Sequence, residues 1–154
     1  MTGQSRVVVI PKEKALFWLD KDGRWQNEDG RFRHKKIIDH FHVSISKDAD
    51  GYYVSRGKGG VLEKVYFRCE DTALFVFNIV ETEKIILILN TRKRIKLNPA
   101  QLYLQHDNLY MIEDGEKIKF AEHALIKISK FIEEKGNKLI IKINGIKYKI
   151  HEKF

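Results

Sequence analysis

The stretch FWLDKDGRWQNEDG, residues 17–30, has a near copy 85 residues later, LYLQHDNLYMIEDG at residues 102–115. Five of the fourteen aligned positions are identical, whereas average residue usage leads to about one. The identical pairs are Leu19/Leu104, Asp22/Asp107, Glu28/Glu113, Asp29/Asp114 and Gly30/Gly115. The aromatic positions also match, because Trp18 and Trp25 align with Tyr103 and Tyr110. This pattern predicts an internal duplication. The alternative is coincidence, since Glu-Asp-Gly is favourable turn chemistry in any protein.

A helical pattern follows each copy. Apolar residues in 34–46 lie three or four positions apart, and an offset of 87 places them on the apolar stripe of residues 121–135. We expect Gly136 to end the second helix. The end of the first segment also alternates between apolar and polar residues, so a strand is the alternative there. Each half then contains a strand, a turn, a strand, the Glu-Asp-Gly turn, a helix and two more strands. The predicted fold class is α+β, with two similar sub-domains at residues 12–70 and 71–154.

Strands are expected wherever β-branched and apolar residues alternate or form short runs between turn residues. In the first half these are residues 14–20, 24–27, 52–56 and 64–69. In the second half they are residues 74–80, 84–89, 94–97, 102–104, 109–112, 139–143 and 146–150. Residues 94–97 are expected to form a short edge strand. Residues 106–108 are expected to form a hairpin turn.

The last two strands are joined by Asn144-Gly145, the preferred two-residue hairpin turn. This turn fixes the register, so that Ile143 faces Ile146, Ile141 faces Tyr148 and Leu139 faces Ile150. We expect these six side chains to pack on one face. The other face is expected to be solvated and basic, with Ile140 as its one apolar member. It carries Lys138, Lys142, Lys147, Lys149 and His151.

The 154-residue composition is that of a globular protein, with 43% apolar and 32% charged residues. Cys69 is the one cysteine, so neither a disulfide framework nor a zinc cluster is expected. The apolar runs are too short for a membrane span, and the N-terminal residues do not follow the pattern of a secretory signal. A reduced, cytoplasmic protein without membrane contact is therefore expected.

The net charge is +8, and its excess is largest in the middle third, mainly from Arg92, Lys93, Arg94 and Lys96. Such an excess favours an anionic partner, although solubility alone also accounts for it. If residues 92–96 are extended, Arg92, Arg94 and Lys96 share one side and can contact phosphates, or can instead protect a sheet edge from aggregation. The glycine-rich stretch Ser55–Gly60 is either a phosphate-binding loop supported by Arg56 and Lys58 or a plain hairpin loop.

No catalytic constellation is evident. The six histidines are dispersed and are expected at the surface: His34, His40, His42, His106, His123 and His151. Cys69 is expected to be a half-buried strand thiol with no neighbouring group to activate it. Glu70 and Asp71 interrupt an apolar series where the halves meet, and either cap a turn or orient a polar partner. The sequence therefore predicts no enzyme, no cofactor and no metal site.

Several motifs together resemble the bacterial family called domain of unknown function 1285. They are Asp22-Gly23-Arg24-Trp25, an apolar helix, Asp50-Gly51-Tyr52-Tyr53-Val54, the strand around Val65–Phe67, and Glu70-Asp71-Thr72-Ala73. Asn90-Thr91, the helix at 121–135 and Gly145 are similar to its second half, so the resemblance spans about residues 16–150. It implies a two-part α+β fold of repeated motifs, with a second half similar to pleckstrin-homology-like domains. It also implies a site for a nucleotide-like ligand between the halves and a part in signalling.

The leading hypothesis is a non-enzymatic binding or sensor module that takes an anionic, nucleotide-like small molecule between its halves. Arginine suits this task because its planar group binds phosphate or carboxylate with two hydrogen bonds. The predicted site residues are Arg56, Lys58, Arg68, Glu70, Asp71, Asn90, Arg92 and Arg94. The alternative is a nucleic-acid or acidic-protein binder that uses the lysine-rich face of the C-terminal hairpin.

Overall fold

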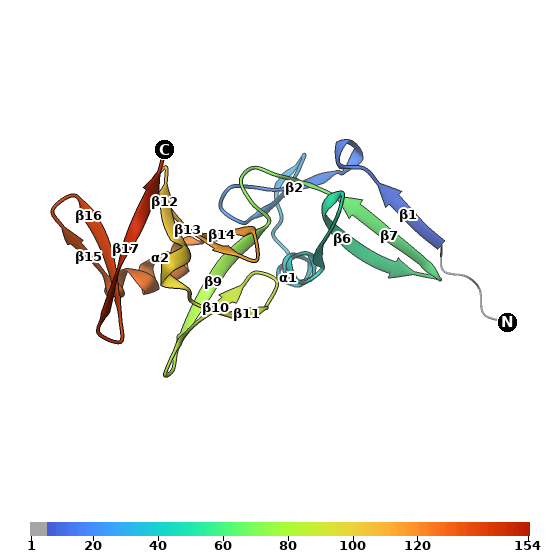
Figure 1. Ribbon diagram of the computed structural model, residues 1–154. Helices are drawn as coiled ribbons and strands as arrows, with labels where there is room; N and C mark the ends of the chain where they lie inside the picture. Colours follow the sequence, from blue (N-terminus) through green and yellow to red (C-terminus); the bar gives the residue numbers. More distant parts are fainter. Residues whose placement is uncertain (1–5) are drawn as a thin grey trace. The chain divides into compact units, whose positions relative to one another are not determined.

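The computed structural model describes residues 6–154 and contains helices and strands in several sheets, consistent with the α+β class (Figure 1). The chain divides into two compact units. The first unit ends at Ala73 and the second begins at Leu74. The α-helices of the described residues, α1 (Lys35–Val43) and α2 (Glu122–Ile128), are both short. Neither is long and apolar enough to cross a membrane.

The first unit contains two sheets, with strand orders β1-β7-β6-β5 and β4-β3-β2-β8. Its strands are β1 (Arg6–Ile10), β2 (Phe17–Leu19), β3 (Trp25–Asn27), β4 (Gly30–Arg31), β5 (Ile45–Asp48), β6 (Gly51–Lys58), β7 (Val61–Tyr66) and β8 (Arg68–Cys69). A 3-10 turn, η1 (Lys12–Lys14), joins β1 to β2. Figure 1 shows β1 beside the β6–β7 hairpin, to which it adds as a parallel strand on β7.

An aromatic cluster fills the core of the first unit. The indole of Trp25 is 1% exposed and makes edge-to-face contacts with Phe17, Phe41 and Phe67 at centroid distances of 5.7, 5.3 and 4.9 Å. Offset and edge-on arrangements are the favourable ones for aromatic rings. Because Phe41 comes from α1, the cluster joins that helix to the strands β2 and β3.

The turn between β2 and β3 is organised by one carboxylate. Oδ1 of Asp20 accepts hydrogen bonds from the backbone N–H groups of Asp22 and Arg24, each at 2.9 Å. Its Oδ2 accepts from the side-chain amide of Gln26 at 2.7 Å. Gly23 has φ of +80°, a conformation that glycine adopts without strain. The Asp-Gly turn expected here is therefore present.

The second unit forms a nine-stranded sheet with the order β11-β10-β9-β14-β13-β12-β17-β16-β15. Its strands are β9 (Leu74–Glu81), β10 (Ile85–Leu89), β11 (Arg94–Lys96), β12 (Leu102–Gln105), β13 (Asn108–Glu113), β14 (Glu116–Phe120), β15 (Ile132–Lys135), β16 (Lys138–Ile143) and β17 (Ile146–Lys153). Two 3-10 turns, η2 (Pro99–Gln101) and η3 (Ser129–Phe131), precede β12 and β15. The buried core includes Val76, Leu87, Leu102, Leu109, Met111, Ile118, Ala124, Ile128 and Ile141.

The prediction of one helix over residues 121–135 is wrong at its C-terminal end. The helix α2 ends at Ile128, and Ile132–Lys135 forms β15, antiparallel to β16. Gly136, with φ of +62°, belongs to the two-residue turn of this hairpin and is not a helix stop. Ile132 fits the apolar stripe of a helix, but in the structure it is a strand residue opposite the buried Ile141. An apolar residue is expected at this position in either structure.

Both Glu-Asp-Gly turns lead into a further strand that was not predicted from the sequence. The first turn precedes β4, which pairs with β3, and the second precedes β14, which pairs with β13. In the first half the predicted helix over residues 34–46 is α1, which ends at Val43. Ile45 already belongs to β5. The alternative of a strand at the end of that segment is therefore correct for its last residues.

The register of the C-terminal hairpin is confirmed. Ile143 pairs with Ile146, Ile141 with Tyr148 and Leu139 with Ile150. Asn144 and Gly145 have φ of +50° and +80°, as this turn requires. The expected packing of all six side chains is wrong at the tip, because Ile146 is 56% exposed. The opposite, lysine-bearing face is exposed as expected.

The predicted edge strand at residues 94–97 is confirmed as β11, which lies at one end of the nine-stranded sheet. However, Arg92 does not share a strand face with Arg94 and Lys96. Arg92 lies in the preceding turn with φ of +71°, and its backbone N–H donates to the carbonyl of Leu89. The row of three cations is therefore reduced to two on β11.

Candidate functional site

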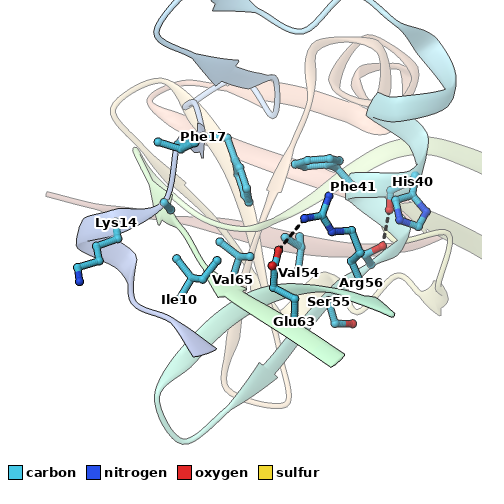
Figure 2. A pocket seen from close by; sticks show the side chains of 13 residues that line it. Ile10, Lys14, Phe17, His40, Phe41, Val54, Ser55, Arg56, Glu63 and Val65 are labelled. Atoms are coloured by element: carbon cyan, nitrogen blue, oxygen red, sulfur yellow. Dashed lines mark hydrogen bonds and ion pairs between the residues drawn. The ribbon is translucent and has the colours of Figure 1, made fainter. Parts of the chain in front are cut away.

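A pocket of about 410 Å³ lies within the first unit, where β6 and β7, the β1–η1–β2 connection and α1 face one another (Figure 2). This volume lies within the range of small-molecule sites. The sheet contributes Val54 and Val65, which are buried and paired across β6 and β7. Ile10, at the end of β1, reaches the pocket because β1 pairs with β7 and places Ile10 opposite Val65.

Two phenylalanines close the pocket on the side away from the sheet. Phe17 from β2 and Phe41 from α1 contact each other edge to face, with centroids 4.9 Å apart. Both belong to the aromatic cluster around Trp25, so the pocket is lined by the outer part of a fixed core. On the η1 side the lining is Ala15 and Leu16, and Leu16 is 77% exposed. The lining is therefore mainly aliphatic and aromatic.

The pocket carries one ion pair at its rim. Arg56 on β6 and Glu63 on β7 face each other in the ladder, and Nη2 of Arg56 lies 3.0 Å from Oε1 of Glu63. The arginine side chain is 67% exposed and the glutamate 28%. Figure 2 shows the guanidinium of Arg56 turned into the pocket, whereas the ammonium of Lys14 points away from the other lining side chains. Arg56 is therefore the cation placed to meet a ligand.

The helix contributes polar groups that are already engaged or exposed. The hydroxyl of Ser44 donates to the backbone carbonyl of His40 at 2.6 Å. The ring of His40 lies at the pocket and is exposed. The lining therefore offers a ligand few free hydrogen-bonding groups. It suits the hydrocarbon part of a ligand better than a polar part.

Of the predicted site residues in the first unit, only Arg56 among those with a described side chain lines this pocket. Lys58 is in β6, and its side chain lies outside the described part of the structure. The guanidinium of Arg68 lies 5.1 Å from the ring centroid of Trp18. Oε1 of Glu70 accepts a hydrogen bond from the backbone N–H of Lys21 at 3.1 Å. Asp71 is half-buried, and its charge adds to the burial that raises the pKa of the Cys69 thiol.

The predicted site residues in the second unit lie near the connection between β10 and β11. Asn90 is 4% exposed and directly follows β10. Its Oδ1 accepts from the backbone N–H of Phe75 at 3.0 Å, and its own N–H donates to the Phe75 carbonyl at 2.9 Å. Arg92 lies in the turn, and Arg94 is exposed on β11. The site predicted between the halves stays a prediction.

Replacing Asn90 with alanine is expected to destabilise the second unit by about 1–3 kcal/mol, because the N–H of the buried Phe75 loses its partner. Thermal unfolding followed by circular dichroism and amide exchange at Phe75 measure the effect. Thr91→Ala, at the neighbouring position where the hydroxyl accepts only a long hydrogen bond of 3.5 Å from the N–H of the exposed Lys93, serves as the control and should lose less. An alanine variant as stable as wild type, with an equally protected Phe75 amide, would contradict the assignment.

Burial shifts the pKa values of one histidine and of the cysteine. Burial lowers the pKa of His42 to about 4, although Asp39 opposes the shift. Its Nδ1 accepts the indole N–H of Trp25 at 3.2 Å. Burial raises the pKa of Cys69 to about 11 despite the charge of Lys12, so its thiol is protonated near neutral pH. The expected half-buried thiol is confirmed, whereas the expectation that His42 lies at the surface is wrong, since it is 4% exposed.

A polar cluster occupies the other face of the β5–β6–β7 sheet. The hydroxyl of Tyr66 donates to Oδ2 of Asp48 at 2.6 Å, and Nζ of Lys64 lies 3.0 Å from the same oxygen. These hydrogen bonds lower the pKa of Asp48 and raise the pKa values of Tyr66 and Lys64. The ammonium of Lys64 also lies 4.4 Å from the ring centroid of Tyr53. The cluster connects all three strands and leaves Tyr66 protonated at neutral pH.

The fold is similar to two solved structures. A DUF1285 family protein from Silicibacter pomeroyi DSS-3 aligns with a TM-score of 0.60 and 10% identity over 97% of this chain and 89% of that protein. A DUF1285 family protein from Shewanella baltica OS155 aligns with a TM-score of 0.50 and 16% identity over 72% of this chain and 87% of that one. No protein-family model matches the sequence, and no curated protein is similar to it. The resemblance to this family, expected from the motifs, is thus confirmed in the fold.

Proposed function

We propose that this protein is a non-enzymatic binding or sensor module whose first unit holds a small molecule with an apolar body and one anionic group. The observation that carries the proposal is the apolar pocket with Arg56 turned into its rim. Sites for small molecules are typically lined by apolar and aromatic side chains, with a few polar groups that fix the orientation of the ligand. The pocket of the first unit has this composition.

The anionic group of the ligand is assigned to Arg56. Its guanidinium has five N–H donors, and Glu63 uses one of them in a single contact at 3.0 Å. A carboxylate or phosphate in the pocket would take up the remaining donors or replace Glu63 as the partner. Because Arg56 is largely exposed, its contribution to affinity is expected to be modest, about 1 kcal/mol.

The non-enzymatic part of the proposal is supported by the state of the two most reactive side chains. The buried His42 is neutral and bonded to Trp25, and Cys69 is a protonated thiol at neutral pH. A general base needs a pKa close to the working pH, and a thiol nucleophile needs a pKa near or below it, so neither side chain meets its requirement. We also propose a role in bacterial signalling and a cytoplasmic location, which the unpaired Cys69 fits.

An internal duplication also belongs to the proposal, and the topology of the units supports it. In the first unit the order β4-β3-β2 continues through the parallel pair β2–β8, and β8 directly follows β7 along the chain. In the second unit the order β14-β13-β12 continues through the parallel pair β12–β17. In the first unit α1 follows β4, and in the second unit α2 follows β14. The 3-10 turns η1 and η2 precede the corresponding strands β2 and β12. The pleckstrin-homology-like character of the second half stays a prediction.

The proposal predicts that decanoate binds to the first unit and that Arg56→Gln weakens this binding about fivefold, the equivalent of about 1 kcal/mol. Glu63→Gln should strengthen it by a similar factor, since Arg56 then loses its competing partner. Octanoate should bind more weakly, by at most about fourfold for each methylene lost, or about 0.8 kcal/mol. Isothermal titration calorimetry at low ionic strength measures all four affinities.

The matched control is Arg94→Gln, which removes an exposed arginine on β11 and should leave decanoate binding unchanged. Absence of decanoate binding, or binding that ignores Arg56 and Glu63, would reject the pocket as the site. Adenosine monophosphate is titrated in parallel. If it binds, and if Arg68→Gln, Arg92→Gln or Arg94→Gln weakens it, the nucleotide-like ligand between the halves is the better proposal.

A second candidate function is the binding of a nucleic acid or an acidic protein by the lysine-rich face of β15–β17. Lys142 and Lys147 face each other across the hairpin, and Lys135 pairs with Lys138 on the adjoining strand. The nearby ammonium of Lys135 lowers the pKa of Lys147, and the carboxylate of Glu133 only partly opposes this effect. The cations on this face therefore repel one another, and a polyanion would relieve that repulsion.

For this second candidate we expect the affinity for a 20-base-pair DNA duplex to fall steeply with salt, with a log–log slope of roughly −4 for four or five phosphate contacts. Lys142→Glu combined with Lys147→Glu should abolish binding, whereas Arg94→Glu with Lys96→Glu should not. Fluorescence anisotropy measures both effects, with polyglutamate as the acidic-protein probe. Binding that is insensitive to salt, or that survives the hairpin substitutions, would exclude this face.

A further inference from the structure

The second unit contains a groove of about 950 Å³ along β11 and the tip of the β16–β17 hairpin. Its lining is part polar and part apolar, and the apolar side chains come from two sides. Strands β10 and β11 and the residue after them contribute Ile85, Ile95 and Leu97, and the hairpin contributes Ile143, Ile146 and Tyr148. Ile146 is 56% exposed, although the hairpin pattern predicts that it packs. The core of this unit thus opens to solvent beside the edge of its sheet.

The backbone of β11 has an unused hydrogen-bonding side. Ile95 faces Leu87 in the ladder, Leu97 N–H donates to the Ile85 carbonyl, and Leu89 N–H donates to the Lys93 carbonyl. In an antiparallel pair, residues that bond to the partner alternate with residues whose N–H and C=O groups point the other way. The backbone N–H and C=O groups of Arg94 and Lys96 therefore point away from β10. In the strand order of this unit, β11 has β10 as its one neighbour.

Positive charge gathers along this edge. Lys84, Lys93, Arg94 and Lys96 are exposed, and none of the four forms an ion pair with another described residue. The acidic side chains at the groove are Glu83, next to Lys84, and Glu113 and Asp114, which lie in and after β13. The edge of β11 itself is therefore cationic.

We propose that β11 and the groove bind an extended segment of a partner protein in which acidic and apolar side chains alternate. The segment adds as a further strand to the edge, using the backbone groups of Arg94 and Lys96. Because side chains of a strand alternate between its two faces, one set enters the groove beside Ile95. The other set of side chains of the segment lies on the opposite face of the sheet, beside Arg94 and Lys96. Main-chain bonds supply affinity in this mode, and alternate side-chain positions supply specificity.

Two alternative roles for this edge fit less well. A second copy of the chain would bring its own β11, and the facing cations would repel one another. Charged edge strands do protect sheets from aggregation, but protection requires no open apolar groove beside the charges. The combination of free backbone groups, unpaired cations and an exposed apolar wall fits an acidic, partly apolar strand.

The probe is a fluorescein-labelled peptide of four Glu-Val repeats with blocked ends, measured by fluorescence anisotropy at low ionic strength. We expect saturable binding by the wild-type chain and at least tenfold weaker binding of a Lys-Val peptide. A Glu-Ser peptide, which lacks the apolar side chains, should also bind more weakly. A Glu-Val peptide methylated at every second backbone nitrogen, on the side that faces β11, should not bind, because it lacks the N–H donors of the added strand.

Arg94→Glu with Lys96→Glu should weaken the Glu-Val peptide at least tenfold, and Ile146→Ser should weaken it about threefold. Both changes are at exposed positions, and circular dichroism checks that the variants fold. Lys142→Glu with Lys147→Glu is the matched control and should have no effect. Equal binding of the N-methylated peptide or of the Lys-Val peptide would overturn the proposal. So would loss of binding in the Lys142/Lys147 variant only, which would assign the peptide to the lysine-rich face.

Discussion

Replacing Trp25 with alanine is expected to lower the free energy of unfolding of the first unit by about 3–5 kcal/mol. The indole is 1% exposed and contacts Phe17, Phe41 and Phe67, so its removal leaves a cavity that rigid rings cannot fill. It also removes the indole N–H that Nδ1 of the buried His42 accepts. A loss of this size is a large part of the stability of an ordinary domain.

Urea unfolding followed by tryptophan fluorescence measures this loss directly. The chain has two tryptophans, Trp18 and Trp25, and both are in the first unit, so Trp18 still reports on that unit in the variant. Trp25→Phe should lose less, since a ring remains in the cluster. Trp18→Phe is the matched control at a half-buried position and should cost less than about 1.5 kcal/mol. If Trp18→Phe and Trp25→Phe lowered the free energy of unfolding equally, Trp25 would not be the centre of the core of the first unit.

Local sequence signals predicted those elements whose partners lie close along the chain. The Asn144-Gly145 turn fixes its own register, and the Asp20–Arg24 turn is held by one carboxylate within five residues. The predicted helix over residues 121–135 is too long because Ile128 and Ile132 fit one helical stripe and equally fit a helix that ends before a strand. Gly136-Asn137 stands between two apolar runs, a pattern that fits a hairpin turn as well as a helix end, and the structure has the hairpin turn.

The pocket could not be predicted in the same way, because its lining is assembled by long-range pairing. Ile10 meets Val65 only after β1 has added to β7, and no local pattern specifies that parallel partner. Arg56 is predicted from its charge and lines this pocket, whereas Phe41 is not, because its helical position predicts only burial. Asn90 is one of the predicted ligand-binding residues, and in the structure its side chain bonds to the backbone of Phe75 within the second unit. A polar residue predicted to orient a ligand can equally satisfy buried backbone, and sequence does not separate these roles.

The first unit is also expected to lose stability in mild acid because of His42. Its pKa is about 4 in the folded protein and 6.5 when unperturbed, since burial disfavours the imidazolium. A folded pKa below the unfolded one stabilises the protein above the unfolded value, and this contribution is lost as the pH falls toward the folded value. The window is therefore about pH 6.5 to 4. At about 1.4 kcal/mol for each pKa unit, the full contribution is about 3 kcal/mol.

Urea unfolding of the wild type and of His42→Gln, followed by tryptophan fluorescence between pH 7 and pH 4, separates this contribution from that of the other titrating groups. Glutamine does not titrate, so most of the pH dependence should disappear, whatever the altered contact with the Trp25 indole N–H costs at pH 7. The lowered pKa of Asp48 acts at more acidic pH, because this carboxylate is protonated only below its unperturbed value of 3.8. A wild-type profile that is flat across this window would be inconsistent with a buried, neutral His42. An equal slope in His42→Gln would assign the acid sensitivity to another group.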